Sequence, residues 1–190
     1  GYIAATSGEV IIEGHDIFKE AEEAKKHIGY LPEIPPLYMD MTVWEYLFTV
    51  ADLKGVPRSE RKSMITDAME KVMITNMKDR LIKNLSKGYK QRVGIAQTLI
   101  GNPDIIILDE PTAVLTPQET EKLFDVLRRM KEDGKSIIII THKLHEVMAL
   151  TDRVAVLRKG EYIGTVDTKT ATEQSLTEMM VGKKVSLNIE

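Results

Sequence analysis

The chain has 190 residues, enough for one domain with a sizeable buried core, and its hydrophobic content of 43% excludes a disordered chain. A formal net charge of −3 gives no global basic field that would call for nucleic acid, and the absence of cysteine excludes disulfides and cysteine-ligated zinc. The longest apolar runs, at 105–108 and 137–140, are far shorter than the ~20 residues that span a bilayer. Any work at a membrane would therefore require a separate membrane-embedded partner.

The first third of the chain predicts two short strands followed by two helices. The strands are expected at 9–12 and 28–31, bounded by turn residues. Thr42 and Glu45 have the spacing of a capping box, so a helix should begin there and run to about Lys54. A second helix is expected from about residue 59. Its apolar face follows helical spacing and consists of Ile65, Ala68, Met69, Val72 and Met73.

The middle of the chain predicts a helix, a strand and a further helix. The pattern is helical from Ser86 to a stop at 101–103, and a buried-type strand follows at 104–109. Thr116 begins another capping box, with proline at the first helical position, and Gly134 ends that helix. The expected core stripe of the helix is Leu123, Phe124, Leu127 and Met130.

The last third predicts a strand, a short helix, a hairpin and a final helix. The strand expected at 136–141 contains a continuous apolar run at 137–140, and a short helix should begin at His142. Two runs at 153–157 and 162–166, separated by a lysine and a glycine, indicate a hairpin. The segment 170–173 is expected to cap the last helix.

These elements predict an α/β fold. Continuous isoleucine-rich strands separated by a helix are typical of a parallel sheet that is covered on both faces. The helices at 43–78 interrupt that alternation and indicate an inserted helical subdomain.

The strongest chemical signal is the pair of carboxylates, Asp109 and Glu110, at the end of the buried strand 105–108. Ligands bind at the carboxyl ends of strands in open α/β sheets, and adjacent strand residues point to opposite sides. One carboxylate suits Mg²⁺, which takes one or two carboxylates together with substrate phosphates. The other can orient or deprotonate an attacking water. The alternative is an acidic pair that only caps the next helix.

Two weaker signals accompany this pair. Ser86 and Gly88 begin a helix whose free N–H groups and dipole form a natural anion site, although a simple N-cap is the alternative. His142 follows the second buried strand, where it could contact a γ-phosphate or the attacking water. A structural histidine is the alternative there.

The order of these motifs resembles the ATP-binding cassette (ABC) ATPase family over essentially the whole chain. The segment 85–91 (LSKGYKQ) resembles the family's signature motif, and 105–110 (IIILDE) resembles its Walker B strand. His142 resembles the switch histidine, 29–33 (GYLPE) the Q-loop, and 111–117 occupies the position of the D-loop.

The resemblance implies a P-loop NTPase-like fold, mostly parallel and covered by helices, with a short antiparallel β part and a helical subdomain at about 35–102. It implies one incomplete domain over 1–190 that uses ATP and Mg²⁺. Its site residues are implied to be Glu110 as general base, His142 at the transition state, Asp109 and Glu33 at the metal, and a nucleotide-binding set. That set is Ser86, Lys87, Gly88, Tyr89 and Glu33.

The implied partners are transmembrane permease subunits and a second ABC ATPase domain that meets this one head to tail. The implied location is the cytoplasmic face of the membrane. The implied function is ATP hydrolysis that powers solute transport. The alternatives are a non-catalytic cassette that only completes a partner's ATP site, and a soluble ABC-type ATPase.

The sequence departs from the family pattern in three places. No G-x-x-x-x-G-K-[ST] string occurs in it, and the chain begins at Gly1 without methionine, so we expect an N-terminal truncation that leaves the fragment inactive alone. Glu33 stands where the Q-loop usually has glutamine, and Thr116 where the D-loop usually has aspartate. The part up to Thr112 resembles exporter-type cassettes, whereas the part after it resembles simple-sugar and nucleoside importers.

Overall fold

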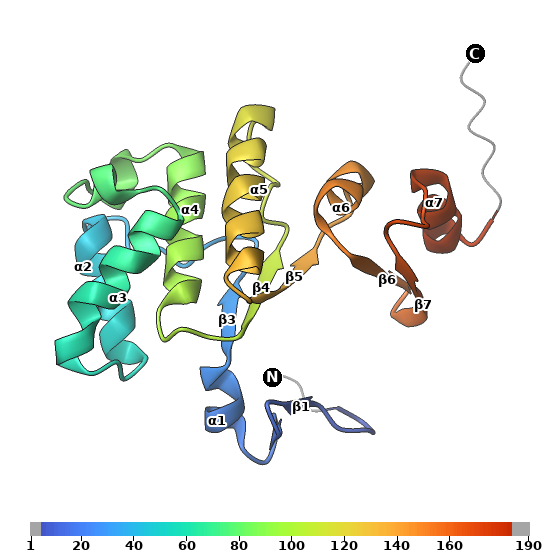
Figure 1. Cartoon of the computed structure of the whole chain (residues 1–190), viewed down its shortest axis with the longest axis horizontal. Coiled ribbons are helices and arrows are strands. Elements are labelled where there is room, and N and C mark those ends of the chain that lie inside the picture. Colours follow the sequence, from blue (N-terminus) through green and yellow to red (C-terminus); the bar gives the residue numbers. More distant parts are fainter. Residues whose placement is uncertain (1–4, 184–190) are drawn as a thin grey trace. The chain divides into compact units, whose positions relative to one another are not determined.

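The computed structural model describes residues 5–183 and divides the chain into two compact units, 1–140 and 141–190. The first unit holds most of the elements (Figure 1). In chain order they are β1 (Ile11–Ile12), β2 (His15–Asp16), α1 (Ala21–Lys26), β3 (Ile28–Leu31), α2 (Val43–Leu53), α3 (Arg58–Lys71), η1 (Thr75–Met77), η2 (Ile82–Asn84), α4 (Lys87–Leu99), β4 (Ile105–Asp109), α5 (Pro117–Glu132) and β5 (Ser136–Ile140).

A three-stranded parallel sheet in the order β3-β4-β5 organises the first unit. Tyr30 pairs with Ile107 and Asp109 pairs with Ile140, so the carboxyl ends of all three strands meet at one edge. β1 and β2 form a separate antiparallel pair, shorter than the strand expected at 9–12. The predicted α/β fold with a parallel sheet and a short antiparallel part is thereby confirmed.

Helix α4 packs very closely against β3 because glycine occupies two contact positions. A Cβ added to Gly29 would collide with the backbone carbonyl of Thr98 in α4. A Cβ added to Gly94 would lie 2.8 Å from Cδ1 of Leu31, which is fully buried. The close approach fixes the position of α4, and hence of its N-terminus, relative to the sheet.

Helices α2, α3 and α4 pack together beside the sheet (Figure 1). The expected capping box starts α2, where the Thr42 hydroxyl accepts from the Glu45 N–H and the Glu45 carboxylate accepts from the Thr42 N–H. The expected apolar face of α3 is buried through Val72, whereas Met73 lies beyond the helix with φ of 57°. Lys54 donates to the carbonyls of Gln97 and Ile100, at 3.0 and 2.7 Å, and so joins the end of α2 to the end of α4.

The second sheet face that the sequence predicts to be covered is open in the described residues. Ile138 and Ile140 of β5 are 51% and 50% exposed, and Tyr30 of β3 is 47% exposed. In contrast, Ile106 and Leu108 of β4 are fully buried. An apolar surface of this kind is ordinarily covered by a further layer of structure.

The second unit contains α6 (Leu144–Leu150), β6 (Arg153–Arg158), β7 (Glu161–Asp167) and α7 (Glu173–Val181). The predicted hairpin is confirmed as the antiparallel pair β6–β7, with an irregularity between Val156 and Leu157. Its core is centred on Val147, Val156 and Leu176. One boundary differs from the prediction, because α6 begins at Leu144 and His142 lies in a bend before it. The expected cap of the last helix is confirmed, since Thr172 is the N-cap of α7 and its hydroxyl accepts from the Ser175 N–H.

Candidate functional site

The register of β3 and β4 brings three of the expected acidic residues to one edge of the sheet. Leu31 ends β3 opposite Leu108, and Glu33 follows two residues later with its side chain exposed. Asp109 is the last residue of β4, and Glu110 follows it directly. Glu33, Asp109 and Glu110 therefore all lie at or just beyond the carboxyl ends of neighbouring parallel strands.

The backbone of Glu110 has a left-handed conformation, with φ of 44°. Its N–H donates to the carbonyl of Ile140 at 2.8 Å, and its carbonyl accepts from the N–H of Ala113 at 3.1 Å. A non-glycine residue in this conformation costs ~1–2 kcal/mol, and such strain concentrates at functional sites. The left-handed conformation turns the chain away from the direction of β4, so the strand ends at Asp109 and Glu110 lies outside it.

The loop after Glu110 leads into the first turn of α5. Leu115 donates its N–H to the carbonyl of Thr112 at 3.1 Å, and Thr112 is almost completely buried. The Thr116 hydroxyl then accepts from the Glu119 N–H, while the Glu119 carboxylate accepts from the Thr116 N–H at 3.1 Å. The predicted capping box is confirmed, and it anchors the end of this loop.

The expected phosphate-binding segment is the N-terminal turn of α4. Ser86 is the N-cap, and its hydroxyl accepts from the Tyr89 N–H at 3.3 Å. Ser86 and Lys87 are exposed, whereas Gly88 is buried. An N-cap of this geometry fits both interpretations of the segment, a structural cap and an anion site, since the other N–H groups of the first turn have no partner within the helix.

Gly88 has a contact that the sequence analysis did not anticipate. A Cβ added to Gly88 would lie 2.7 Å from the carboxyl carbon of Glu119. The two residues are 31 positions apart, and a capping-box pattern gives no indication of a second contact at long range. Only the folded chain therefore reveals that Glu119 lies against the expected phosphate-binding segment.

His142 lies two residues beyond the end of β5, in the bend that begins the second unit, and its side chain is exposed. Lys143 donates its N–H to the Thr141 hydroxyl at 3.1 Å, which defines this bend. Because His142 and the acidic residues belong to different units, the approach of His142 to Asp109 and Glu110 stays a prediction.

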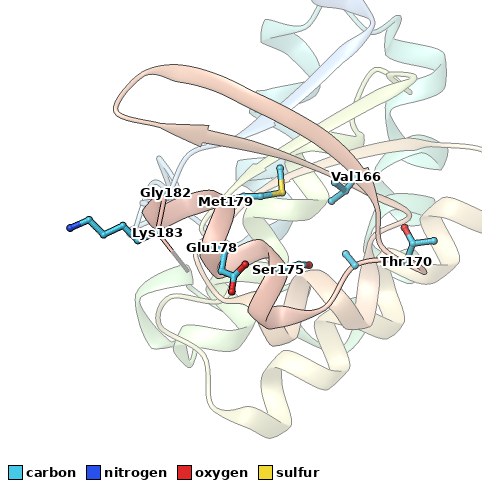
Figure 2. A pocket seen from close by; sticks show the side chains of 8 residues that line it. Val166, Thr170, Ser175, Glu178, Met179, Gly182 and Lys183 are labelled. Atoms are coloured by element: carbon cyan, nitrogen blue, oxygen red, sulfur yellow. The ribbon is translucent and has the colours of Figure 1, made fainter. Parts of the chain in front are cut away.

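The second unit contains a pocket that does not coincide with the acidic residues at the sheet edge. The pocket has a volume of about 620 Å³ (Figure 2). Its lining residues are Val166, Thr170, Ala171, Ser175, Glu178, Met179, Gly182 and Lys183.

Among residues 5–183, no three histidine or acidic side chains gather closely enough to hold a metal ion without another ligand. No helix in the same range has the length and apolar character needed to cross a bilayer.

A parallel sheet with carboxylates at its carboxyl edge, and a helix whose N-terminus has a serine N-cap, belong to the open α/β class of proteins, which bind ligands at this edge. Within that class, the chain belongs to the ABC transporter family, whose model matches residues 1–113. The family resemblance inferred from the sequence is thereby confirmed.

Known relatives and structures agree with this assignment. The chain is 37% identical over its own full length to a nucleoside import ATP-binding protein of Lactococcus lactis, and the match covers 38% of that protein. It is 53% identical over 106 residues to a glucose import ATP-binding protein of Haloferax volcanii, covering 56% of this chain and 19% of that protein. The fold matches cbiO1 from Clostridium perfringens, part of the ABC transporter complex cbiONQ, with a TM-score of 0.78 and 29% identity over 86% of this chain and 67% of that one. The chain thus spans less than two fifths of the length of these curated relatives.

Proposed function

We propose that this chain is part of an ATP-binding and ATP-hydrolysing subunit that powers solute transport through partner transmembrane subunits. The observation that carries the proposal is the β3–β4 register, because it gathers Glu33, Asp109 and Glu110 at the sheet edge where ABC cassettes are expected to bind ATP. The left-handed backbone of Glu110 supports it further, since strain of this kind persists where a function requires it.

Glu110 is the proposed general base, which takes a proton from the water that attacks the γ-phosphate. Asp109 and Glu33 fit Mg²⁺, because this ion needs only one or two carboxylates when phosphates and waters complete its shell. When bound, Mg²⁺ neutralises charge on the phosphates. His142 is proposed to stabilise the transition state, and the turn from Ser86 to Tyr89, including Lys87 and Gly88, is proposed to bind the γ-phosphate of an ATP held by a partner cassette.

The open face of β5 supports a further part of the proposal. The 190 residues contain no G-x-x-x-x-G-K-[ST] string, and in the described residues β5 pairs only with β4. We infer that an additional strand and helix, carrying the phosphate-binding loop, pair with β5 and cover Ile138 and Ile140. Residues 1–190 are then one incomplete cassette, which would hydrolyse little ATP by itself.

The proposed partners are a second cassette and transmembrane permease subunits at the cytoplasmic face of a membrane. The helical part of the first unit, within about 35–102, is the proposed contact with the permease. It supports this role by exposing large apolar side chains, and Leu53, Tyr38 and Met39 are 76%, 52% and 45% exposed. Import of a sugar or nucleoside is the proposed direction and substrate class, because relatives over this region are named as import proteins for such solutes.

The test is ATP hydrolysis by the chain joined to a segment that carries a P-loop. We expect Mg²⁺-dependent turnover, which Glu110→Gln lowers by ~10²- to 10⁴-fold while ATP binding is retained. Glu121→Gln is the matched control, because Glu121 is an exposed glutamate of α5 outside the site. Full turnover in Glu110→Gln would remove Glu110 from the proposed role.

The same preparation separates the catalytic proposal from its alternatives. A non-catalytic cassette would only complete a partner's ATP site, so Glu110→Gln would leave the turnover of the assembled protein unchanged. A soluble ATPase would show turnover that permease subunits do not change. In contrast, a transport ATPase reconstituted with its permease in vesicles should couple ATP hydrolysis to solute uptake.

A further inference from the structure

Two segments of the proposed ATPase site are joined by one short stretch of chain and one long-range contact. The loop 110–116 begins at Glu110, the proposed base, and ends at Thr116, the N-cap of α5. Glu119, in the first turn of α5, reaches the N-terminal turn of α4 at Gly88. The first turn of α5, which follows this loop directly, is therefore in contact with the turn proposed to bind the partner's ATP.

The orientation of the Glu119 carboxylate is fixed from its own helix. Its Oε2 accepts from the Thr116 N–H and the Thr116 hydroxyl, at 3.1 and 3.2 Å, while the Glu119 N–H donates back to that hydroxyl at 3.3 Å. The other oxygen, Oε1, faces Gly88 and occupies the space that a Cβ at that position would need. A carboxylate held in this way lies between the two helices, and turning it aside would cost the hydrogen bonds that its Oε2 accepts at the cap of α5.

We propose that Glu119 is a positioning residue that couples the loop 110–116 to the N-terminal turn of α4. The inference rests on the proposed function, and it adds a route between two ATP sites. Glu110 serves the ATP of its own cassette, whereas Ser86 and Gly88 serve the ATP of the partner cassette. A displacement of Glu110 during hydrolysis moves Thr116, and Glu119 transmits that movement to Gly88.

The chain has no cysteine, so spin labels can be attached at chosen positions through introduced cysteines. The distance between two labels then tests the contact without ATP. Cysteines introduced at Asn84, just before α4, and at Val114, in the loop, carry spin labels at exposed positions. We expect a single narrow distance distribution in the full chain, retained in Glu119→Gln, which keeps the shape of the side chain. Glu119→Ala should lose the narrow distribution, whereas the matched control Glu121→Ala should keep it.

An unchanged distribution in Glu119→Ala would overturn the proposal and leave Glu119 as a helix cap alone. If circular dichroism shows that Glu119→Ala is unfolded, Gly88→Ala tests the same contact from the other side. Its added methyl group should shift the mean distance, and Glu119→Ser in the same chain should reverse the shift by making room. Absence of a shift in folded Gly88→Ala would equally overturn the coupling.

A kinetic measurement on the assembled ATPase tests the consequence for the reaction. Glu119→Ala should lower kcat by roughly 10- to 100-fold, because a small misplacement of phosphate-binding groups is enough for such a loss. KM for ATP should change less and stay within about twofold, since each ATP is proposed to be held mainly by the other cassette. Glu119→Gln should restore kcat, and an unchanged kcat in Glu119→Ala would contradict the coupling. If the unsubstituted protein has no ATPase activity, the proposed function fails, while the spin-label distances still decide on Glu119.

Discussion

Glu110 has a left-handed backbone conformation, which should lower the stability of the fold. Its side chain, as the proposed base, should be required for ATP turnover. A left-handed non-glycine residue costs ~1–2 kcal/mol, and glycine loses about 0.5–1 kcal/mol more chain entropy on folding than alanine. At the middle of both ranges, Glu110→Gly should therefore be more stable than Glu110→Ala by about 0.8 kcal/mol. For a chain of this size, that difference raises Tm by roughly 1–4 °C. Both variants lack the proposed base and should lose ATP turnover equally.

The comparison of glycine with alanine isolates the backbone, because both substitutions remove the same side-chain contacts. Thermal unfolding followed by circular dichroism gives the stability difference, and phosphate release by the chain joined to a P-loop segment gives the turnover. Lys159→Gly is the matched control, since Lys159 also has a positive φ of 51° but lies in the β6–β7 turn. It should gain stability and keep its turnover. If Glu110→Gly were no more stable than Glu110→Ala, or kept its turnover, the link between strain and function at Glu110 would be refuted.

Three other perturbations test the packing around the site. Gly29→Ala should destabilise the protein by about 1–3 kcal/mol, because its methyl group meets the carbonyl of Thr98; a urea midpoint equal to that of the parent would contradict this close approach. Thr116→Ala removes the N-cap of α5 and should cost ~1 kcal/mol in the same assay, whereas Thr116→Ser should cost less; equal losses would show that the hydroxyl does not matter. The His27 side chain, 2.7 Å from Asp104, lowers the pKa of that carboxyl below its ordinary 3.8, so Asp104 stabilises the fold at neutral pH and this contribution is lost as pH falls below 3.8. Asp104→Asn should therefore lower the urea midpoint near neutral pH, and the difference from the parent should shrink in acid; a difference independent of pH would rule out the carboxylate as its source.

Local signals predicted the elements well because their causes lie within a few residues. The start of α2 at Val43 and that of α5 at Pro117 follow from capping boxes, in which a threonine and a glutamate three residues later satisfy each other's N–H groups. The strand at 28–31 and the parallel pairing of β4 with β5 follow from apolar runs bounded by turns. Motif order was enough to identify the family, because the spacing of several motifs is far more specific than any one of them.

Other features could not be predicted because they depend on partners distant in sequence or on the backbone itself. The positive φ of Glu110 has no residue signature, since left-handed turns favour glycine or asparagine rather than glutamate. An isoleucine run indicates a buried strand, but Ile138 and Ile140 are exposed. The run predicts that these side chains are buried in the complete fold, but it does not predict which segment covers them. The assignment of chemical roles to Glu33, Asp109, Glu110 and His142 also stays a prediction, since roles depend on where phosphates lie.

The contact between Glu119 and Gly88 gives a physical reason for glycine at this position of the signature-like motif. Gly88 has an ordinary helical conformation, so no left-handed backbone requires glycine there. The space of the missing side chain is instead filled by the carboxylate of Glu119 in α5. A glycine in a phosphate-binding turn is usually explained by the approach of the ligand, but here the protein itself already uses that space. Substitutions at position 88 should therefore disturb the loop after Glu110 even when no nucleotide is bound.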